Sequence, residues 1–206
     1  MSGEGSQRRA VIGAFSAGVV VTALSAWVLT RSAAPTDELS LLGRGVDDVM
    51  LVNAHGASVR WGDLSRRRRA VFFGFTHCAV VCPVTVYELT AALDRIGAPG
   101  DSVAIEFVTV DPARDTPERL GTYFSGFGPR VTGYTGETEA ISRVMRSLGV
   151  EARRSELPGG GYTFDHTATV FLIASGRVVE VIAYGTPPEI FDERLRALIV
   201  SPNSGG

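Results

Sequence analysis

The chain of 206 residues contains two cysteines, Cys78 and Cys82, four positions apart. They stand between an apolar run, residues 71–75, that predicts a buried strand, and a helix that we expect to begin near Pro83. Residues i and i+4 near a helix start share one face, so the two thiols can form a disulfide or share a metal ion. Because a helix N-terminus favours negative charge, we expect it to lower the pKa of the thiols.

Two thiolates leave a metal ion under-coordinated, so a metal site needs a third ligand. The chain has three histidines. We expect His55 in an exposed turn and the side chain of His77 directed away from that of Cys78. His166 is better placed, because it follows a glycine-rich segment and precedes an apolar strand that can hold it rigidly. Asp165 beside it either orients the imidazole or ends the loop.

A site of two thiolates and one imidazole is soft and has a low coordination number. Such a donor set suits copper, Cu(I) in particular, better than magnesium, calcium or manganese. Zinc accepts the same ligands but usually takes a fourth. The residue types therefore leave three alternatives open: a copper site, which the donor set favours, a zinc site, and a redox pair without metal.

The N-terminal segment predicts where the domain works. Arg8 and Arg9 precede residues 10–30, which carry no charge and are long enough to cross a bilayer as a helix. We expect residues 1–9 in the cytoplasm, a membrane anchor at 10–30 and a translocated domain, since basic flanks stay inside. A cleaved signal peptide is the alternative, which the length of the run and Pro35 disfavour. The domain then lies on the outer side of the cell membrane, where disulfides persist.

After the anchor we expect a linker at 31–46, one domain at 47–201 and a flexible tail at 202–206. Periodicity and turn residues predict, in order, a hairpin at 48–61, strand 71–75, a helix from Pro83 to Ile96, strand 103–110, a helix capped by Thr116, strand 131–134, helix 137–148, a flexible loop at 153–162, a hairpin at 168–183 and helix 189–200. This alternation predicts an α/β domain with a mixed sheet flanked by helices. The cysteine pair between a strand and a helix narrows the predicted fold to a thioredoxin-like one.

Charge patterning excludes one class of function. The formal net charge is −2, which argues against a nucleic-acid binder. Arg66 to Arg69 form a basic run before the expected strand at 71–75. A solvated turn is the favoured interpretation of this run, and docking on an anionic lipid surface is the alternative.

Five blocks of sequence follow one another through the predicted domain. They are Phe73-Gly74-Phe75-Thr76-His77-Cys78, Val81-Cys82-Pro83, Val108-Thr109-Val110-Asp111-Pro112-Ala113-Arg114-Asp115-Thr116-Pro117, Thr132-Gly133-Tyr134-Thr135-Gly136 and Asp165-His166-Thr167. In this order they resemble the Sco/SenC family, over roughly residues 48–200. The resemblance implies a thioredoxin-like fold on a single membrane anchor. It also implies delivery of copper, as Cu(I) or Cu(II), to the dinuclear copper site of cytochrome c oxidase during assembly of the respiratory chain.

The resemblance implies that Cys78, Cys82 and His166 bind the copper, and that the two cysteines can form a disulfide. The implied partner is the copper-containing subunit of the oxidase or another copper chaperone, and a metallochaperone is favoured over an enzyme. A thiol–disulfide oxidoreductase that reduces partner cysteines with the Cys78/Cys82 pair is the main alternative. A peroxide-reducing relative of the peroxiredoxins has only fold-level support.

The chain departs from the family pattern between the cysteines. Ala79-Val80-Val81 stands where the family often has Pro-Asp-Val, and loss of the acidic side chain should favour thiolates and the reduced or metal-bound state. Asp111 lies within a matched block. It is expected either to line the site or only to start a turn after the strand.

Overall fold

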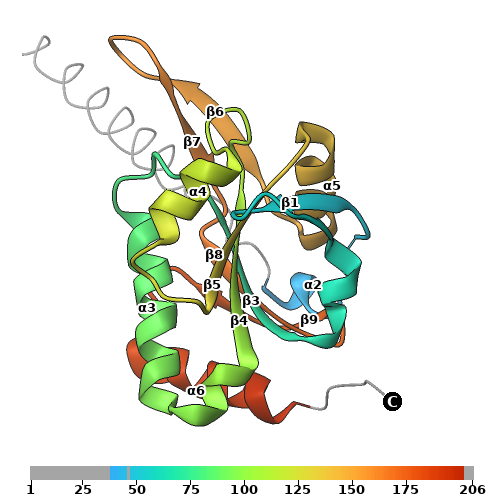
Figure 1. Cartoon of the computed structure of the whole chain (residues 1–206). Coiled ribbons are helices and arrows are strands. Elements are labelled where there is room, and N and C mark those ends of the chain that lie inside the picture. Colours follow the sequence, from blue (N-terminus) through green and yellow to red (C-terminus); the bar gives the residue numbers. More distant parts are fainter. Residues whose placement is uncertain (1–37, 46, 202–206) are drawn as a thin grey trace, which may run out of the picture. The chain divides into compact units, whose positions relative to one another are not determined.

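The computed structural model describes residues 38–45 and 47–201 (Figure 1). The predicted cytoplasmic segment at 1–9, the anchor at 10–30, most of the linker at 31–46 and the tail at 202–206 lie outside the described residues. Among the residues that the structure describes, no helix has the length and apolar character needed to span a membrane.

A seven-stranded mixed sheet lies at the centre of the domain, in the order β2-β1-β5-β4-β3-β8-β9. Its strands are β1 (Met50–Asn53), β2 (Ser58–Arg60), β3 (Arg68–Gly74), β4 (Val103–Thr109), β5 (Val131–Thr135), β8 (Thr169–Ala174) and β9 (Arg177–Ala183). The middle strands β5, β4 and β3 are parallel, and antiparallel strands pair on either side of them. Parallel neighbours need crossover connections, which the helices after β3 and β4 supply.

Helices cover both faces of this sheet (Figure 1). One face packs against α3 (Val81–Ile96), α4 (Pro117–Phe124) and α6 (Pro188–Val200), and the other against α2 (Glu38–Leu41), the 3-10 helix η1 (Trp61–Arg66) and α5 (Thr138–Leu148). A second 3-10 helix, η2 (Ala98–Ser102), follows α3. Along β3, Ala70 and Phe72 enter the first core while Val71 and Phe73 enter the second. A strand buried on both faces reads as a continuous apolar run, and the mixed sheet flanked by helices is confirmed.

The helix starts follow the capping residues. Pro83 lies in the first turn of α3, where its missing N–H costs nothing, although the helix begins two residues earlier than predicted. Thr116 caps α4 as predicted: its hydroxyl accepts a hydrogen bond from the backbone N–H of Arg119 at 3.3 Å, and Pro117 is the first helical residue.

The prediction of a flexible loop at 153–162 was wrong. Strands β6 (Ala152–Glu156) and β7 (Tyr162–His166) pair antiparallel there as a separate two-stranded sheet, which we call the β6–β7 hairpin. Only residues 157–161 form its turn, in which Gly159, Gly160 and Gly161 have φ of 97°, 99° and 80°. Glycine adopts such values without strain, so the glycines mark the turn of a hairpin and not a loop throughout.

The arginine run is a solvated turn only in part: Arg67 is exposed between η1 and β3, whereas Arg68 and Arg69 belong to β3. Arg69 is fully buried, donates from Nε to Glu106 Oε2 on β4 at 2.5 Å and stacks 3.9 Å from the ring centre of Trp61. Arg68 donates to the carbonyl oxygen of Leu198 in α6 at 3.0 Å. Both guanidinium groups are therefore engaged inside the domain.

We predict that Arg69→Ala lowers the free energy of unfolding by roughly 3–5 kcal/mol, because it leaves the Glu106 carboxylate buried without its cation. Urea unfolding followed by circular dichroism measures this loss. Arg60→Ala is the matched control, since it removes an exposed pair with Asp48 at 2.8 Å and should change stability little. Equal losses in the two variants would contradict a structural role for the buried pair.

Candidate functional site

The two cysteines lie where β3 gives way to α3. The backbone N–H of Cys78 donates to the carbonyl oxygen of Phe75 at 3.0 Å, which closes the loop after the strand. The backbone N–H of Cys82, in the first turn of α3, donates to Cys78 Sγ at 3.5 Å. Both residues are free thiols; Cys78 is half-buried and Cys82 is fully buried. The start of α3 therefore places the sulfur of Cys78 beside the backbone of Cys82, as the spacing of the two cysteines predicts.

His166 is the last residue of β7 and reaches the same place from the β6–β7 hairpin. Its Nε2 lies 3.7 Å from Cys82 Sγ, and its Nδ1 lies 3.1 Å from the carbonyl oxygen of Thr167. Because a carbonyl only accepts, Nδ1 carries the proton and Nε2 turns its lone pair toward the sulfur. The rings of Phe72 and Phe75 meet the imidazole edge-on, with centroids 6.1 and 5.9 Å away.

Burial governs the protonation of this pair. It raises the pKa of the Cys82 thiol far above its usual value, and the nearby Cys78 adds to the rise. The expected lowering of the thiol pKa by the helix N-terminus is therefore wrong for Cys82, because desolvation of a fully buried thiolate outweighs the dipole. Burial also lowers the pKa of His166, so its imidazole is neutral at neutral pH, the form that binds metals.

The spacing of the pair fits two ligands of one ion. Sulfur and imidazole nitrogen lie about 2.3 and about 2.0 Å from a bound zinc ion, so two such ligands at roughly 120° stand about 3.7 Å apart. Cys82 Sγ and His166 Nε2 have this separation, and Cys78 Sγ lies at the same helix start. Within residues 38–45 and 47–201, no group of three or more His, Cys, Asp and Glu side chains is already gathered around a metal position.

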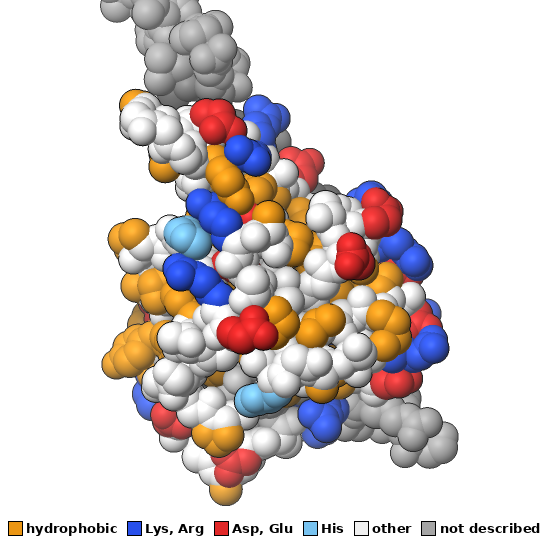
Figure 2. Space-filling model, turned by 45° about the horizontal axis from the view of Figure 1, so that its top comes forward, with side chains coloured by type: hydrophobic (Ala, Val, Ile, Leu, Met, Phe, Trp, Pro, Cys, Tyr) orange, Lys and Arg blue, Asp and Glu red, His pale blue; other side chains and the backbone are white. Residues whose placement is uncertain are grey.

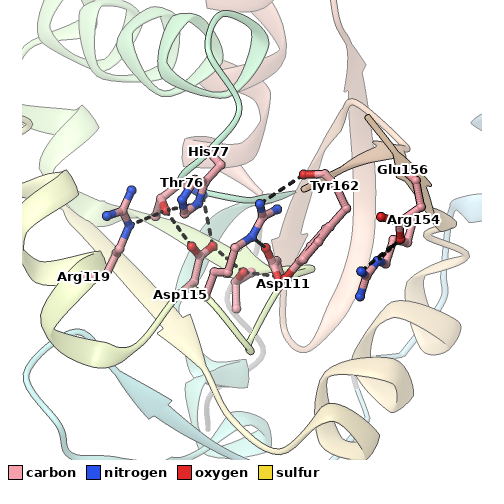
Figure 3. Close-up of polar contacts among 10 residues, drawn as sticks. Thr76, His77, Asp111, Asp115, Arg119, Arg154, Glu156 and Tyr162 are labelled. Carbon is pink, nitrogen blue, oxygen red and sulfur yellow. Dashed lines mark hydrogen bonds and ion pairs between the residues drawn. The ribbon is translucent and has the colours of Figure 1, made fainter. Parts of the chain in front are cut away.

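The other predicted residues make no hydrogen bond to the sulfurs among the described residues. His55 is exposed in the turn between β1 and β2, and the exposed His77 points its Nδ1 toward Thr76 Oγ1 at 3.4 Å (Figure 3). Asp165 does not orient the imidazole: it is exposed and accepts a hydrogen bond from Ser155 Oγ within the hairpin at 3.1 Å. The carbonyl of the residue after His166 takes that role.

A buried carboxylate that we did not predict fixes the cysteine loop (Figure 3). Asp115 accepts hydrogen bonds from Thr76 N at 3.0 Å, Thr76 Oγ1 at 2.6 Å and Thr109 Oγ1 at 2.6 Å. Thr76 precedes Cys78 by two residues and also accepts from Arg119 Nε at 3.0 Å. Asp115 stands in a matched sequence block, and this was the signal that could have identified it.

Tyr123 on α4 is a second residue that sequence reasoning missed. Its hydroxyl is buried and has no hydrogen-bond partner among the described residues. Burial raises the pKa of Tyr123 to about 12, and the negative charges of Cys82 and Cys78 contribute to the rise. The phenol is therefore protonated at neutral pH, a hydroxyl donor in the electrostatic neighbourhood of the two sulfurs.

The surface beside Cys78 is apolar. Val80, Val84 and Tyr87 follow one another on the outer side of the α3 start and are 60%, 37% and 66% exposed. Figure 2, which turns the top of Figure 1 forward, shows hydrophobic side chains interspersed with basic and acidic ones over the face that it presents. A molecule that reaches the half-buried thiol must therefore meet a partly apolar surface.

Comparison with known proteins identifies the family. A sequence model described as SCO1/SenC matches residues 44–200. Protein SCO1 homolog 1, mitochondrial, of Arabidopsis thaliana is 34% identical over 125 residues, which cover 60% of this chain and 37% of that protein. Protein SenC of Rhodobacter capsulatus is 31% identical over 150 residues, 69% of this chain and 67% of that protein. The chain thus spans from about a third to two thirds of the length of these two relatives.

A solved structure shows the same architecture. The structure of Bradyrhizobium japonicum ScoI with copper bound is 33% identical and superposes with a TM-score of 0.67, covering 74% of this chain and 98% of that chain. This likeness confirms the thioredoxin-like α/β fold. The family match extends from just before β1 to the end of α6 and includes both cysteines and His166. This chain therefore belongs to the SCO1/SenC family.

Proposed function

We propose that this protein is a membrane-anchored metallochaperone that binds copper through Cys78, Cys82 and His166 and delivers it to the dinuclear copper site of cytochrome c oxidase. The observation that carries the proposal is the 3.7 Å contact of Cys82 Sγ with His166 Nε2, which joins two metal-binding side chains 84 residues apart. Soft sulfur and imidazole donors favour copper. The similar structure that holds copper supports the same choice.

The three residues have different parts in binding. Cys82 gives up its thiol proton when the ion binds, because the ligand is the thiolate. The neutral imidazole of His166 binds without losing a proton, since its Nδ1–H stays on the carbonyl of Thr167. Cys78 is the more exposed thiol and is the one that an incoming ligand of a partner meets first. Transfer then begins by replacement of this sulfur.

The proposed setting is the outer side of the cell membrane, with residues 10–30 as the single anchor. The length of this uncharged run and its basic flank support the orientation. The proposed partner is the copper-containing subunit of the oxidase or another copper chaperone, either of which must expose its own copper ligands to the face around Cys78.

A thiol–disulfide reductase is the second candidate, favoured by the unequal exposure of the two thiols. The half-buried Cys78 can attack a partner disulfide as a thiolate, forming a mixed disulfide and releasing one partner thiolate. The buried Cys82 then attacks Cys78 Sγ, which releases the second partner thiolate and leaves a Cys78–Cys82 disulfide. The protein loses two electrons and the partner gains them.

We predict that His166→Ala weakens copper binding by the full-length protein at least about tenfold, because the ion loses its imidazole ligand. Competition titration with a Cu(I) chelator measures the affinity, and circular dichroism checks the fold. His77→Ala is the control: it also removes a histidine, one that neighbours Cys78 but is exposed and turned toward Thr76, and should leave the affinity unchanged. Equal affinity in wild type and His166→Ala would refute the proposed ligand set.

We predict that iodoacetamide labels Cys78 faster than Cys82 at neutral pH. Cys82 is fully buried and burial raises the pKa of its thiol, so little of it is present as reactive thiolate. Mass spectrometry of the Cys78→Ser and Cys82→Ser variants reports each rate separately. The same comparison in urea should bring the rates together, and a faster Cys82 in the folded protein would contradict the structure.

The two candidate functions differ in their dependence on His166. A reductase should still reduce a partner disulfide in the His166→Ala variant and in the presence of a strong copper chelator. A metallochaperone should lose copper delivery under both conditions. Assays of both activities on the same variants decide which role this chain performs.

A further inference from the structure

The loop between β4 and α4 lies between the two segments that carry the proposed ligands (Figure 3). At its end, Asp115 holds Thr76 and therefore the cysteine loop. Asp111, near its start, and Arg114 contact Tyr162, the first residue of β7. Asp111 thus does more than start a turn, since its side chain is 2% exposed and faces the β6–β7 hairpin.

Three contacts hold Tyr162 against this loop, and a fourth joins the two loop residues that make them. Its hydroxyl donates to Asp111 Oδ1 at 3.0 Å, and its carbonyl oxygen accepts from Arg114 Nη1 at 3.0 Å. The Arg114 guanidinium carbon stands 3.7 Å from the ring centre of Tyr162, and Arg114 Nε bonds to the Asp111 carboxylate. Stacking of a guanidinium on an aromatic face and a hydrogen bond to a carboxylate use the two features that distinguish arginine from lysine.

The opposite face of the ring provides an internal comparison. The guanidinium carbon of Arg154 also stands 3.7 Å from the centre of the Tyr162 ring, and Figure 3 shows its side chain across the ring from the Asp111 side. Arg154 belongs to β6, so its contact stays within the hairpin. Arg114 belongs to the body of the domain, so its contact ties the hairpin to that body.

Ring contacts connect Tyr162 with His166. Residues 162, 164 and 166 share one face of the strand. The Tyr162 ring meets Phe164 at 5.7 Å, Phe164 meets Phe75 at 5.7 Å, and Phe75 meets the imidazole of His166 at 5.9 Å. A two-stranded sheet is marginal by itself, and the β6–β7 hairpin is a sheet separate from the seven-stranded one. Its place therefore depends on side-chain contacts such as these.

We propose that Asp111 and Arg114 are positioning residues that clamp Tyr162 and so set the distance of His166 from Cys82. This inference rests on the proposed function, because the distance matters through copper binding. An almost fully buried carboxylate paired with a cation is costly to desolvate and by itself is weak evidence for stability. Fixing a ligand-bearing hairpin gives this pair a role beyond stability.

The test measures copper affinity of the full-length protein for Arg114→Lys, both in wild type and in the His166→Ala background. Lysine retains the charge beside Asp111 but loses the stack and the reach to the Tyr162 carbonyl. We expect a loss of about tenfold or more in the wild-type background. We expect no further loss when His166 is already absent, because the clamp acts through that residue. Arg154→Lys, on the other face of the same ring, should keep its affinity within about twofold of wild type.

Hydrogen exchange of the metal-free protein gives a readout that does not involve copper. In Arg114→Lys, the amides of residues 152–166 should exchange faster while those of α3 stay as in wild type. Should Arg114→Lys fail to fold, Tyr162→Phe provides the gentler variant, since it removes only the hydroxyl bond to Asp111 and should give the same pattern with a smaller loss of affinity.

The outcomes separate the two proposals. Equal weakening by Arg114→Lys in both backgrounds, or unchanged exchange in the hairpin, would overturn the clamp. A copper affinity that does not depend on His166 would overturn the proposed ligand set instead, and the exchange measurement would still decide whether Arg114 holds the hairpin.

Discussion

The position of the cysteines depends on one buried carboxylate, that of Asp115. A buried charge is costly unless it is hydrogen-bonded. The Asp115 carboxylate accepts hydrogen bonds from the hydroxyls of Thr76 and Thr109, each at 2.6 Å. It therefore holds the ends of the parallel strands β3 and β4 in one register, in which Gly74 pairs with Thr109. A Cβ on Gly74 would stand 2.7 Å from Cys82 Sγ, so the sulfur packs directly on the end of β3. The thiol is placed by the sheet.

The imidazole has a different kind of support. His166 stands on a two-stranded hairpin that is separate from the main sheet, held by rings and by the contacts of Tyr162. Segments with few ladder hydrogen bonds to the core open more readily than core strands. A proposed copper carrier must both hold its metal and release it. In the proposed transfer, placing the thiols at the end of the main sheet and the imidazole on the hairpin lets the hairpin move away once an incoming ligand has replaced Cys78.

The elements that were predicted correctly are those whose packing requires a recognisable pattern of residue types in the sequence. Residues 70–73 alternate between two cores and read as a continuous apolar run, and Thr116 caps its helix by local geometry. The β6–β7 hairpin leaves a weaker pattern, since β6 is largely exposed and polar and only the short β7 alternates aromatic with polar residues. The raised pKa of Cys82 and the role of Asp115 depend on burial by segments distant in sequence. The spacing of residues along the chain does not show how deeply such distant segments bury a side chain.

Burial also bears on the loop between the cysteines, where Val80 stands in place of the acidic residue frequent in the family. Val80 is 60% exposed, so having valine there in place of an acidic residue changes the charge at the surface. The largest cause of the raised pKa of Cys82 is instead desolvation. Desolvation opposes a free thiolate but not one whose charge a bound cation neutralises. The buried site slows attack by Cys82 on a disulfide, and a proposed copper ion bound there must displace the same thiol proton. Both proposed roles therefore depend on how readily Cys82 loses its proton, and burial bears on that step more than the exposed change at Val80 does.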